Sequence, residues 1–276
     1  FGFTFAKAGL GHFPPLLLMG MRFVLAAFLL AWFVPLPRGH FWTLCWISFI
    51  AATLQYGLTF SGLALMAATP AVLLVQSEVI FGVIIAAILL GERPSLRQIL
   101  GIVMASCGVV VILGAPALEG QWLGIGLVLS GALVWAFGQV LIRRLDGALG
   151  GFQLTAWIGV MAGPQMLLAS CLIDGNPLPA IQAAPIEAWL TVIYLGVVMT
   201  AIGYSAWYYV LARYPVPMVM PVLLLLPVAA IFGAVTMLGE VPDWMVLAGG
   251  MVVIFGVGVV VVEPAYLLAW WRKKTG

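Results

Sequence analysis

The chain has 276 residues, of which 64% are hydrophobic and only 7% are charged, and its formal net charge at pH 7 is +2. Soluble domains carry roughly 25% charged residues, so this composition excludes a water-soluble globular protein and indicates an integral membrane protein. The small net charge gives no electrostatic basis for a nucleic-acid partner.

Apolar runs bounded by proline, glycine and charged residues predict the membrane spans. The chain opens inside such a run, residues 1–9, and a complete span needs about 20 apolar residues. We therefore expect further residues before Phe1 in the native protein. Nine complete spans are predicted after this opening run, at 14–34, 41–66, 70–90, 96–115, 121–143, 152–173, 187–212, 216–238 and 243–262. The predicted fold class is an all-α integral membrane protein with ten transmembrane helices, the first truncated.

The basic residues predict the orientation of these spans. With the N-terminus in the cytoplasm, the inward-facing segments hold Arg38, Arg93, Arg97, Arg143, Arg144, Arg213, Arg272, Lys273 and Lys274, and the outward-facing loops hold no basic residue. Cytoplasmic loops carry an excess of Lys and Arg, so both termini are predicted to be cytoplasmic. The tail 263–276 carries Trp270 and Trp271 beside basic residues, which is typical of an amphipathic segment at the membrane interface.

A stretch of the first half recurs in the second half. Leu90-Gly91-Glu92 and Pro94 return as Leu238-Gly239-Glu240 and Pro242, and one constant shift also aligns Gly101 with Gly249, Gly108 with Gly256 and Tyr56 with Tyr204. Such self-similarity indicates an internal repeat. The repeat predicts two five-helix units, 1–115 and 116–262, followed by the cytoplasmic tail. Because five is odd, the second unit is inverted in the membrane, an architecture common among secondary transporters. A duplication in a structural membrane protein is the alternative.

The Leu-Gly-Glu pattern with its two following glycines, present in both halves, resembles the EamA repeat of the drug/metabolite transporter superfamily. The resemblance covers nearly the whole chain, and within the superfamily the chain most resembles bacterial exporters of aromatic amino acids. It implies a multi-pass protein of the bacterial inner membrane that exports amino acids by alternating access, with aromatic or other hydrophobic side chains preferred. Efflux of drugs or other small metabolites is the alternative, followed by a non-transporting scaffold or a channel.

We find no sequence motif for an enzyme, a phosphate-binding loop or a metal site. The cysteines Cys45, Cys107 and Cys171 and the two histidines are scattered without metal-ligand spacing, so we expect no disulfide framework, metal or cofactor. Transport is then expected to use a gradient of substrate or ion. The expected partners are a small-molecule substrate and the lipid bilayer. A Gly-x-x-x-Gly pattern at Gly159 and Gly163 packs helices either within the fold or between the protomers of a homodimer.

Charged residues inside spans are costly in lipid and are therefore candidates for function. Glu78 and Arg22 each lie eight residues past the proline that opens their span, about 12 Å deep from the same side. Opposite charges at one depth favour a pair, and Lys7 is the other candidate partner of Glu78. The pair is either a gate or site for a zwitterionic cargo, or a structural ion pair that holds helices together.

Neutral polar and aromatic residues within spans are the remaining candidates for a substrate site: Gln55, Tyr56, Gln76, Ser77, Trp135, Gln139, Tyr204, Trp207 and Tyr208. Ordinary helix packing is the alternative for each of them. The repeat places Tyr56 and Tyr204 at equivalent positions, so we expect both near a cavity built by the third, fourth, eighth and ninth spans, roofed by the first and sixth. Pro221 and Pro227 interrupt the ninth span and predict a hinge.

Overall fold

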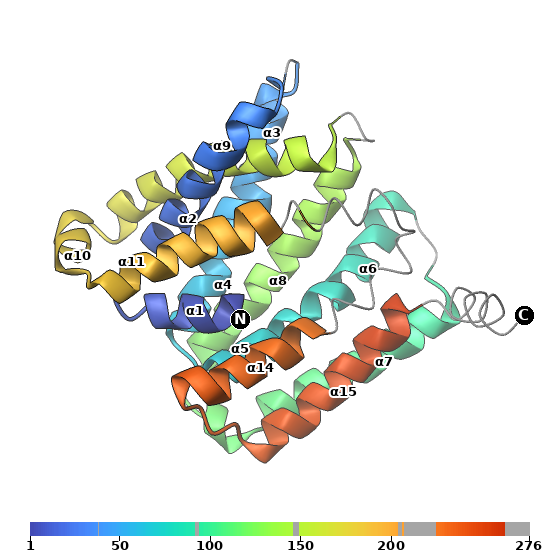
Figure 1. Cartoon of the computed structure of the whole chain (residues 1–276). Helices are drawn as coiled ribbons and strands as arrows, with labels where there is room; N and C mark the ends of the chain where they lie inside the picture. Colours follow the sequence, from blue (N-terminus) through green and yellow to red (C-terminus); the bar gives the residue numbers. More distant parts are fainter. Residues whose placement is uncertain (38, 92–93, 146–148, 204–205, 207–224, 263–276) are drawn as a thin grey trace, which may run out of the picture.

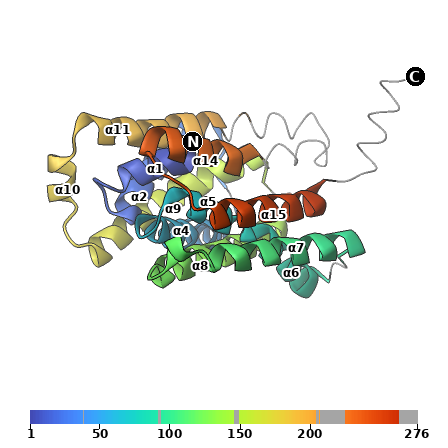
Figure 2. The same cartoon turned by 90° about the horizontal axis from the view of Figure 1, so that it is seen from below.

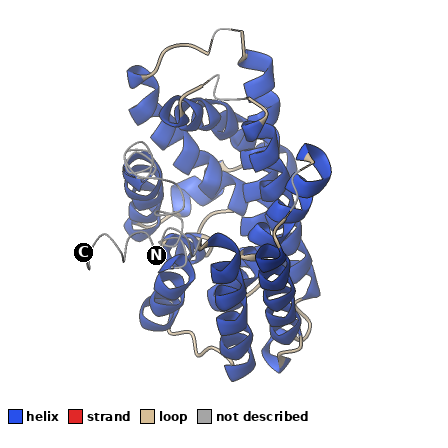
Figure 3. Cartoon of the chain, turned by 90° about the vertical axis from the view of Figure 1, so that its right-hand side faces the viewer, coloured by secondary structure: helices blue, strands red, loops and turns tan. Residues whose placement is uncertain are grey.

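The structure is a computed structural model, and it describes residues 1–37, 39–91, 94–145, 149–203, 206 and 225–262. This described part of the chain is helical and contains no strand (Figure 3). Its elements are α1 (Gly2–Gly9), α2 (Pro15–Leu30), η1 (Ala31–Phe33), α3 (Phe41–Ser48), η2 (Phe49–Leu54), α4 (Gln55–Ala64), α5 (Ala68–Val75), α6 (Ser77–Leu90), α7 (Leu96–Leu113), η3 (Pro116–Leu118), α8 (Trp122–Arg143), α9 (Gly151–Ile173), α10 (Leu178–Ala183), α11 (Ile186–Ile193), η4 (Tyr194–Ile202), α14 (Leu225–Leu238) and α15 (Trp244–Val261).

Helical segments long and apolar enough to cross a membrane account for most of the described chain. Seven such segments are found in it, at Pro15–Phe33, Phe41–Ala64, Ala68–Leu90, Leu96–Leu113, Trp122–Ile142, Gly151–Ile173 and Trp244–Val261. Two shorter apolar segments, Ile186–Ile202 and Leu225–Leu238, lie where the eighth and ninth spans are predicted, and residues 207–224 between them are outside the described residues. The all-helical membrane fold is thus confirmed, with boundaries within a few residues of those predicted where the chain is described.

Figure 1 shows how these helices are arranged. Helices α2, α9 and α11 lie on one side of the molecule and α7, α14 and α15 on the other, with α4 and α8 between them. The most extensive helix pairs are α7 with α15, α2 with α9, and α4 with α8. Every one of these pairs joins a helix of the first half of the chain to a helix of the second half.

The pair α7 and α15 lies side by side in two perpendicular views (Figure 2) and packs through glycines. Gly101 faces Gly256 and Gly108 faces Gly249: a Cβ atom at Gly108 would lie 2.6 Å from the carbonyl oxygen of Gly249. No side chain fits at that distance, so glycine is required for the two backbones to approach. In lipid, such close packing of small residues is what associates helices, because the surrounding acyl chains are as apolar as the side chains.

The Gly-x-x-x-Gly pattern of α9 packs within the chain. A Cβ atom at Gly163 would lie 3.0 Å from the backbone nitrogen of Val24, and one at Gly159 would lie 3.6 Å from the Phe23 carbonyl oxygen. Both glycines therefore face α2 of the same molecule. The pattern therefore packs two helices within the fold, and it gives no argument for a homodimer.

Three of the predicted spans are irregular along their length. The third contains a π-helical segment, η2, between α3 and α4, and the fourth is broken at Gln76 between α5 and α6. The described part of the eighth span runs from α11 into a second π-helical segment, η4. π-Helical turns are rare and are frequently found at functional sites, so η2 and η4 mark where a site is to be sought.

Candidate functional site

A cavity of ≈ 230 Å³ lies between elements from both halves of the chain. It is bounded by α2, η2, α4, α8, α9 and η4, and both π-helical segments contribute to its wall. The lining residues are Phe23, Ala51, Ala52, Tyr56, Trp135, Gln139, Ile142, Leu154, Thr155, Ile158 and Thr200.

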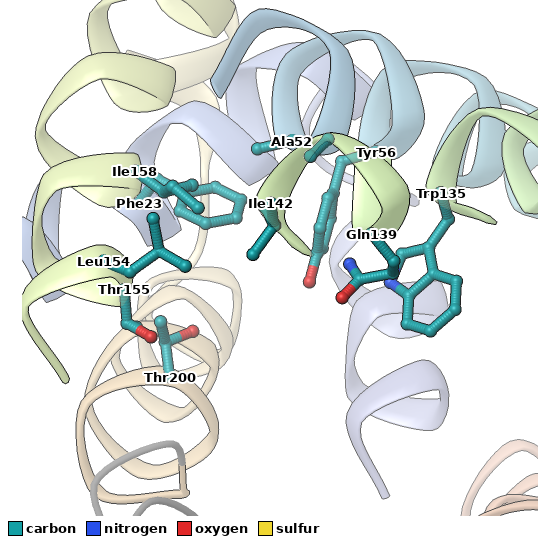
Figure 4. Close-up of a pocket in the computed structure, with 11 residues that line it drawn as sticks. Phe23, Ala52, Tyr56, Trp135, Gln139, Ile142, Leu154, Thr155, Ile158 and Thr200 are labelled. Carbon is teal, nitrogen blue, oxygen red and sulfur yellow. The ribbon is translucent and has the colours of Figure 1, made fainter. Parts of the chain in front are cut away.

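The cavity combines aromatic rings with a few polar groups. Figure 4 shows Tyr56, Gln139 and Trp135 on one side of the open space and Thr155 and Thr200 on the opposite side. Small-molecule sites have this character, in which apolar and aromatic walls supply contact area and a small number of polar groups orient the ligand.

The ring of Tyr56 is held in place by its neighbours. It stacks on Phe60 with a centroid distance of 5.4 Å and meets the edge of Phe23 at 5.0 Å. The Tyr56 ring also lies 5.3 Å from Cζ of Arg22, within cation–π range. Because three side chains fix the ring, Tyr56 presents a preorganised surface to the cavity.

Arg22 lies immediately behind this wall. Its side chain is 7% exposed, and its Nε donates a hydrogen bond of 2.7 Å to Oγ1 of Thr200. That hydroxyl in turn donates to the carbonyl oxygen of Leu195, at 2.8 Å. The guanidinium also lies 5.7 Å from the ring of Phe23. Arg22 therefore links α2 to the π-helical segment η4 at the cavity wall.

The structure does not pair Arg22 with Glu78. In the described part of the chain, Glu78 makes no hydrogen bond or ion pair, and Arg22 is engaged by Thr200 and by aromatic rings instead. Counting residues predicts how deep a residue lies along its span, but not the side of the helix on which its side chain lies. In the folded chain, the Arg22 side chain lies on the side of α2 that faces η4.

Lys7, the other predicted partner of Glu78, also bonds elsewhere. Its Nζ donates to the carbonyl oxygens of Leu63 and Ala64, at 2.8 and 3.2 Å, at the C-terminal end of α4. A cation is stabilised at this end of a helix because the last carbonyl groups are unpaired and carry partial negative charge.

Glu240 of the second Leu-Gly-Glu pattern caps the next helix. One carboxylate oxygen accepts from the backbone N–H of Ala68, and the other accepts from the N–H and hydroxyl of Thr69, at 2.9 and 2.8 Å. Such contacts satisfy unpaired N–H groups at the N-terminus of α5. Lys7 and Glu240 thus hold the junction of α4 and α5 from its two sides. Sequence reasoning gave Glu240 no such role, and its presence in a repeated motif was the available signal.

Of the other predicted site residues, some line the cavity, some lie elsewhere in the structure, and some lie outside the described residues. Tyr56, Trp135 and Gln139 line the cavity together. Gln55 is buried against its own helix, where its Nε2 donates to Oγ1 of Thr59, and Gln76 and Ser77 lie at the break between α5 and α6 rather than at the cavity. Tyr204, Trp207, Tyr208 and Pro221 lie outside the described residues, and Pro227 lies near the start of α14, after residues that are not described.

Thr155 and Thr200 are cavity residues that the sequence analysis missed. Both are polar residues within predicted spans, so the rule that singled out Gln139 would also have found them. The apolar lining residues, such as Ile142 and Leu154, carry no signal that separates them from lipid-facing residues.

Comparison with known proteins identifies the family. The sequence profile of the EamA-like transporter family matches residues 1–114 and 122–262. The chain belongs to this family. It is a multi-pass membrane protein and a transporter, as the repeated Leu-Gly-Glu pattern predicted, and it is not an enzyme.

Named relatives of this EamA-family protein include a probable amino-acid metabolite efflux pump of Salmonella typhimurium, 31% identical over 92% of this chain and 88% of the relative. A pump of the same name in Escherichia coli is 29% identical over the same shares. A probable terminal-alkyne amino-acid exporter of Streptantibioticus cattleyicolor is 32% identical over 67% of this chain and 61% of the relative. One crystal structure, 22% identical, matches the fold with a TM-score of 0.66 over 92% of this chain and 90% of that chain.

Proposed function

We propose that this EamA-family protein is a secondary transporter that exports amino acids across the bacterial inner membrane, with aromatic or other hydrophobic side chains preferred. The observation that carries the proposal is the cavity between the two halves, in which the rings of Phe23, Tyr56 and Trp135 accompany three polar side chains. Aromatic faces favour an apolar or aromatic side chain, and the polar groups favour an amino acid over a hydrocarbon. The names of the amino-acid efflux relatives support the same substrate class.

The proposal includes ten helices arranged as two inverted five-helix repeats, 1–115 and 116–262. Support comes from contacts that occur in equivalent pairs: η2 packs on α9 as η4 packs on α2, and η2 packs on α8 as η4 packs on α1. The facing glycines of α7 and α15 are also equivalent under the repeat, since Gly101 corresponds to Gly249 and Gly108 to Gly256. Self-equivalent contacts of this kind are those that a two-fold axis generates.

Two further features support the same symmetry. Both π-helical segments fall at corresponding positions of the third and eighth spans. The glycines of the two Leu-Gly-Glu patterns have left-handed backbones, with φ of 68° at Gly91 and 67° at Gly239, and each directly follows a helix. Glycine adopts this conformation without steric cost, which accounts for its place in both patterns.

Alternating access requires that one end of the cavity is closed while the other is open. We infer that Lys7 and Glu240 close the outer end, because they hold the junction of α4 and α5 on the side predicted to face away from the cytoplasm. The cavity reaches instead towards Ile142 and Leu154, which lie beside the loop between α8 and α9 that is predicted to be cytoplasmic. Loading from the cytoplasm is the direction that an exporter needs.

The proposal is tested by flux of radiolabelled L-phenylalanine, L-leucine and L-methionine into proteoliposomes, with and without a pH gradient. Saturable flux that unlabelled amino acid inhibits is the expected result. Saturable efflux of a cationic dye such as ethidium with no amino-acid flux would assign the protein to drug efflux instead. Ion currents far above carrier turnover would indicate a channel, and the absence of flux of every compound would indicate a scaffold.

A further inference from the structure

Among the described side chains, Arg22 is the only charged one that is buried, with 7% of its surface exposed. It lies within the membrane span formed by α2. A buried guanidinium is costly unless a negative charge or a full set of acceptors compensates it. In the described structure Arg22 has no carboxylate within ion-pair distance, and its contacts are to Thr200, Met19 and two aromatic rings. The charge is therefore only partly compensated by the protein.

The donors of this guanidinium are mostly unused. Arginine has five N–H groups, of which one on Nε binds Thr200 and one on Nη1 points at the sulfur of Met19, a weak acceptor, at 4.0 Å. The polar side-chain atoms that are both fully buried and unpaired in the described chain belong to other residues, Ser48, Gln55, Ser77 and Gln121. Nη2 of Arg22 makes no hydrogen bond within the described structure and is absent from this set, so it is not fully enclosed by protein.

Arg22 is not itself a lining residue, but it contacts lining residues on both walls of the cavity. Thr200 lies on one wall and Tyr56 on the opposite wall (Figure 4), and the guanidinium reaches both, with 2.7 Å from Nε to Oγ1 of Thr200 and 5.3 Å from Cζ to the ring of Tyr56. The ring and the hydroxyl hold the guanidinium in position without occupying its terminal N–H groups. This is the arrangement of a prepared anion-binding group, and it differs from that of a saturated structural ion pair.

We propose that Arg22 binds the carboxylate of the transported molecule and so makes the cavity specific for small carboxylic acids. The proposal rests on the proposed function, and it deepens that function by naming the group that the site recognises. The planar fork of a guanidinium matches a carboxylate in bidentate geometry. The carboxylate would supply the negative charge that the described chain does not, while the apolar part of the same molecule contacts Tyr56 and Trp135.

The test compares each amino acid with its amide, in which the carboxylate is replaced by a neutral group of the same shape. Equilibrium binding of L-phenylalanine, L-leucine and L-methionine and of their amides is measured on the purified full chain in detergent. The unmodified protein should bind the acid at least about tenfold more tightly than the amide, since a hydrogen bond to a charged group contributes that much or more. Arg22→Gln should weaken acid binding about tenfold to a hundredfold and should not weaken amide binding.

Two further variants separate recognition from folding. Arg22→Lys keeps the charge and loses the fork, so it should recover part of the preference for the acid even where Arg22→Gln does not fold. Arg97→Gln, in the first turn of α7 and away from the cavity, is the matched control and should leave both affinities unchanged.

The outcomes for the two proposals can be distinguished. An unmodified protein that binds acid and amide equally, or an Arg22→Gln variant that keeps the preference for the acid, overturns the role of Arg22 and leaves export of amino acids standing. An unmodified protein that binds none of the acids and amides overturns the proposed function and this inference together.

Discussion

The cavity makes its most direct prediction at Tyr56. Replacing Tyr56 by alanine removes a ring that lines the cavity and that stacks on Phe60 and meets Phe23 edge to face. Each aromatic pair contributes about 0.5–1.5 kcal/mol beyond its burial, and the contact with Arg22 contributes about 0.5–2 kcal/mol. The variant should therefore be less stable, and it should also lose its contact with the cargo.

The loss of affinity follows from the contact that the cargo makes. Losing one ring or hydrogen-bond contact costs about 1–3 kcal/mol, which corresponds to roughly fivefold to more than a hundredfold in affinity. Tyr56→Phe keeps the ring and removes only the hydroxyl, so it should lie between Tyr56→Ala and the unmodified protein. The measurement is the apparent affinity for L-phenylalanine in proteoliposome flux, with thermal unfolding in detergent recorded for each variant.

Tyr194→Ala is the matched control for this experiment. The Tyr194 ring packs on Phe5, with a centroid distance of 4.1 Å, and it is not part of the cavity wall. The control should lose stability without losing affinity. Unchanged affinity in a folded Tyr56→Ala variant, or an equal loss of affinity in both alanine variants, would refute the placement of the substrate in this cavity.

Three further predictions follow from the topology and from the two carboxylates. In a chain cleared of its native cysteines, a cysteine at Asn176 should react with a membrane-impermeant thiol reagent applied to intact cells and one at Gly150 should not; the reverse pattern would contradict the predicted orientation. Glu240→Gln should weaken the cap of α5 and lower the unfolding temperature, because a charged acceptor at a helix N-terminus typically contributes about 0.5–2 kcal/mol, whereas Glu119→Gln, on an exposed turn, should leave it unchanged. Glu78→Gln should remove the dependence of transport on a pH gradient, because an ionisable residue within a span is a candidate for function. Stability and substrate exchange should persist, since Glu78 has no hydrogen bond or ion pair among the described residues. A loss of stability with equal impairment of every transport mode would show that Glu78 is structural.

The membrane spans could be predicted from the sequence because the bilayer imposes a local rule. Backbone polar groups in lipid must pair within their own segment, so an apolar run such as 152–173 becomes a helix almost regardless of its neighbours. The structure places that helix at Gly151–Ile173. The glycines of the repeat were likewise visible in the sequence, and the contact of Gly108 with Gly249 explains their spacing.

The partners of the charged residues were decided only by the tertiary structure. Counting residues gave Arg22 and Glu78 the same depth, but depth does not say towards which neighbour a helix turns a side chain. Packing of α2 on α9 and η4 sets that rotation and brings Arg22 to Thr200, a residue from the other half of the chain. The same holds for Glu240, whose bonds to Ala68 and Thr69 join segments far apart in the sequence. Local hydropathy therefore determines which segments cross the membrane, whereas the cavity and its charges depend on how helices from both halves rotate and pack against one another.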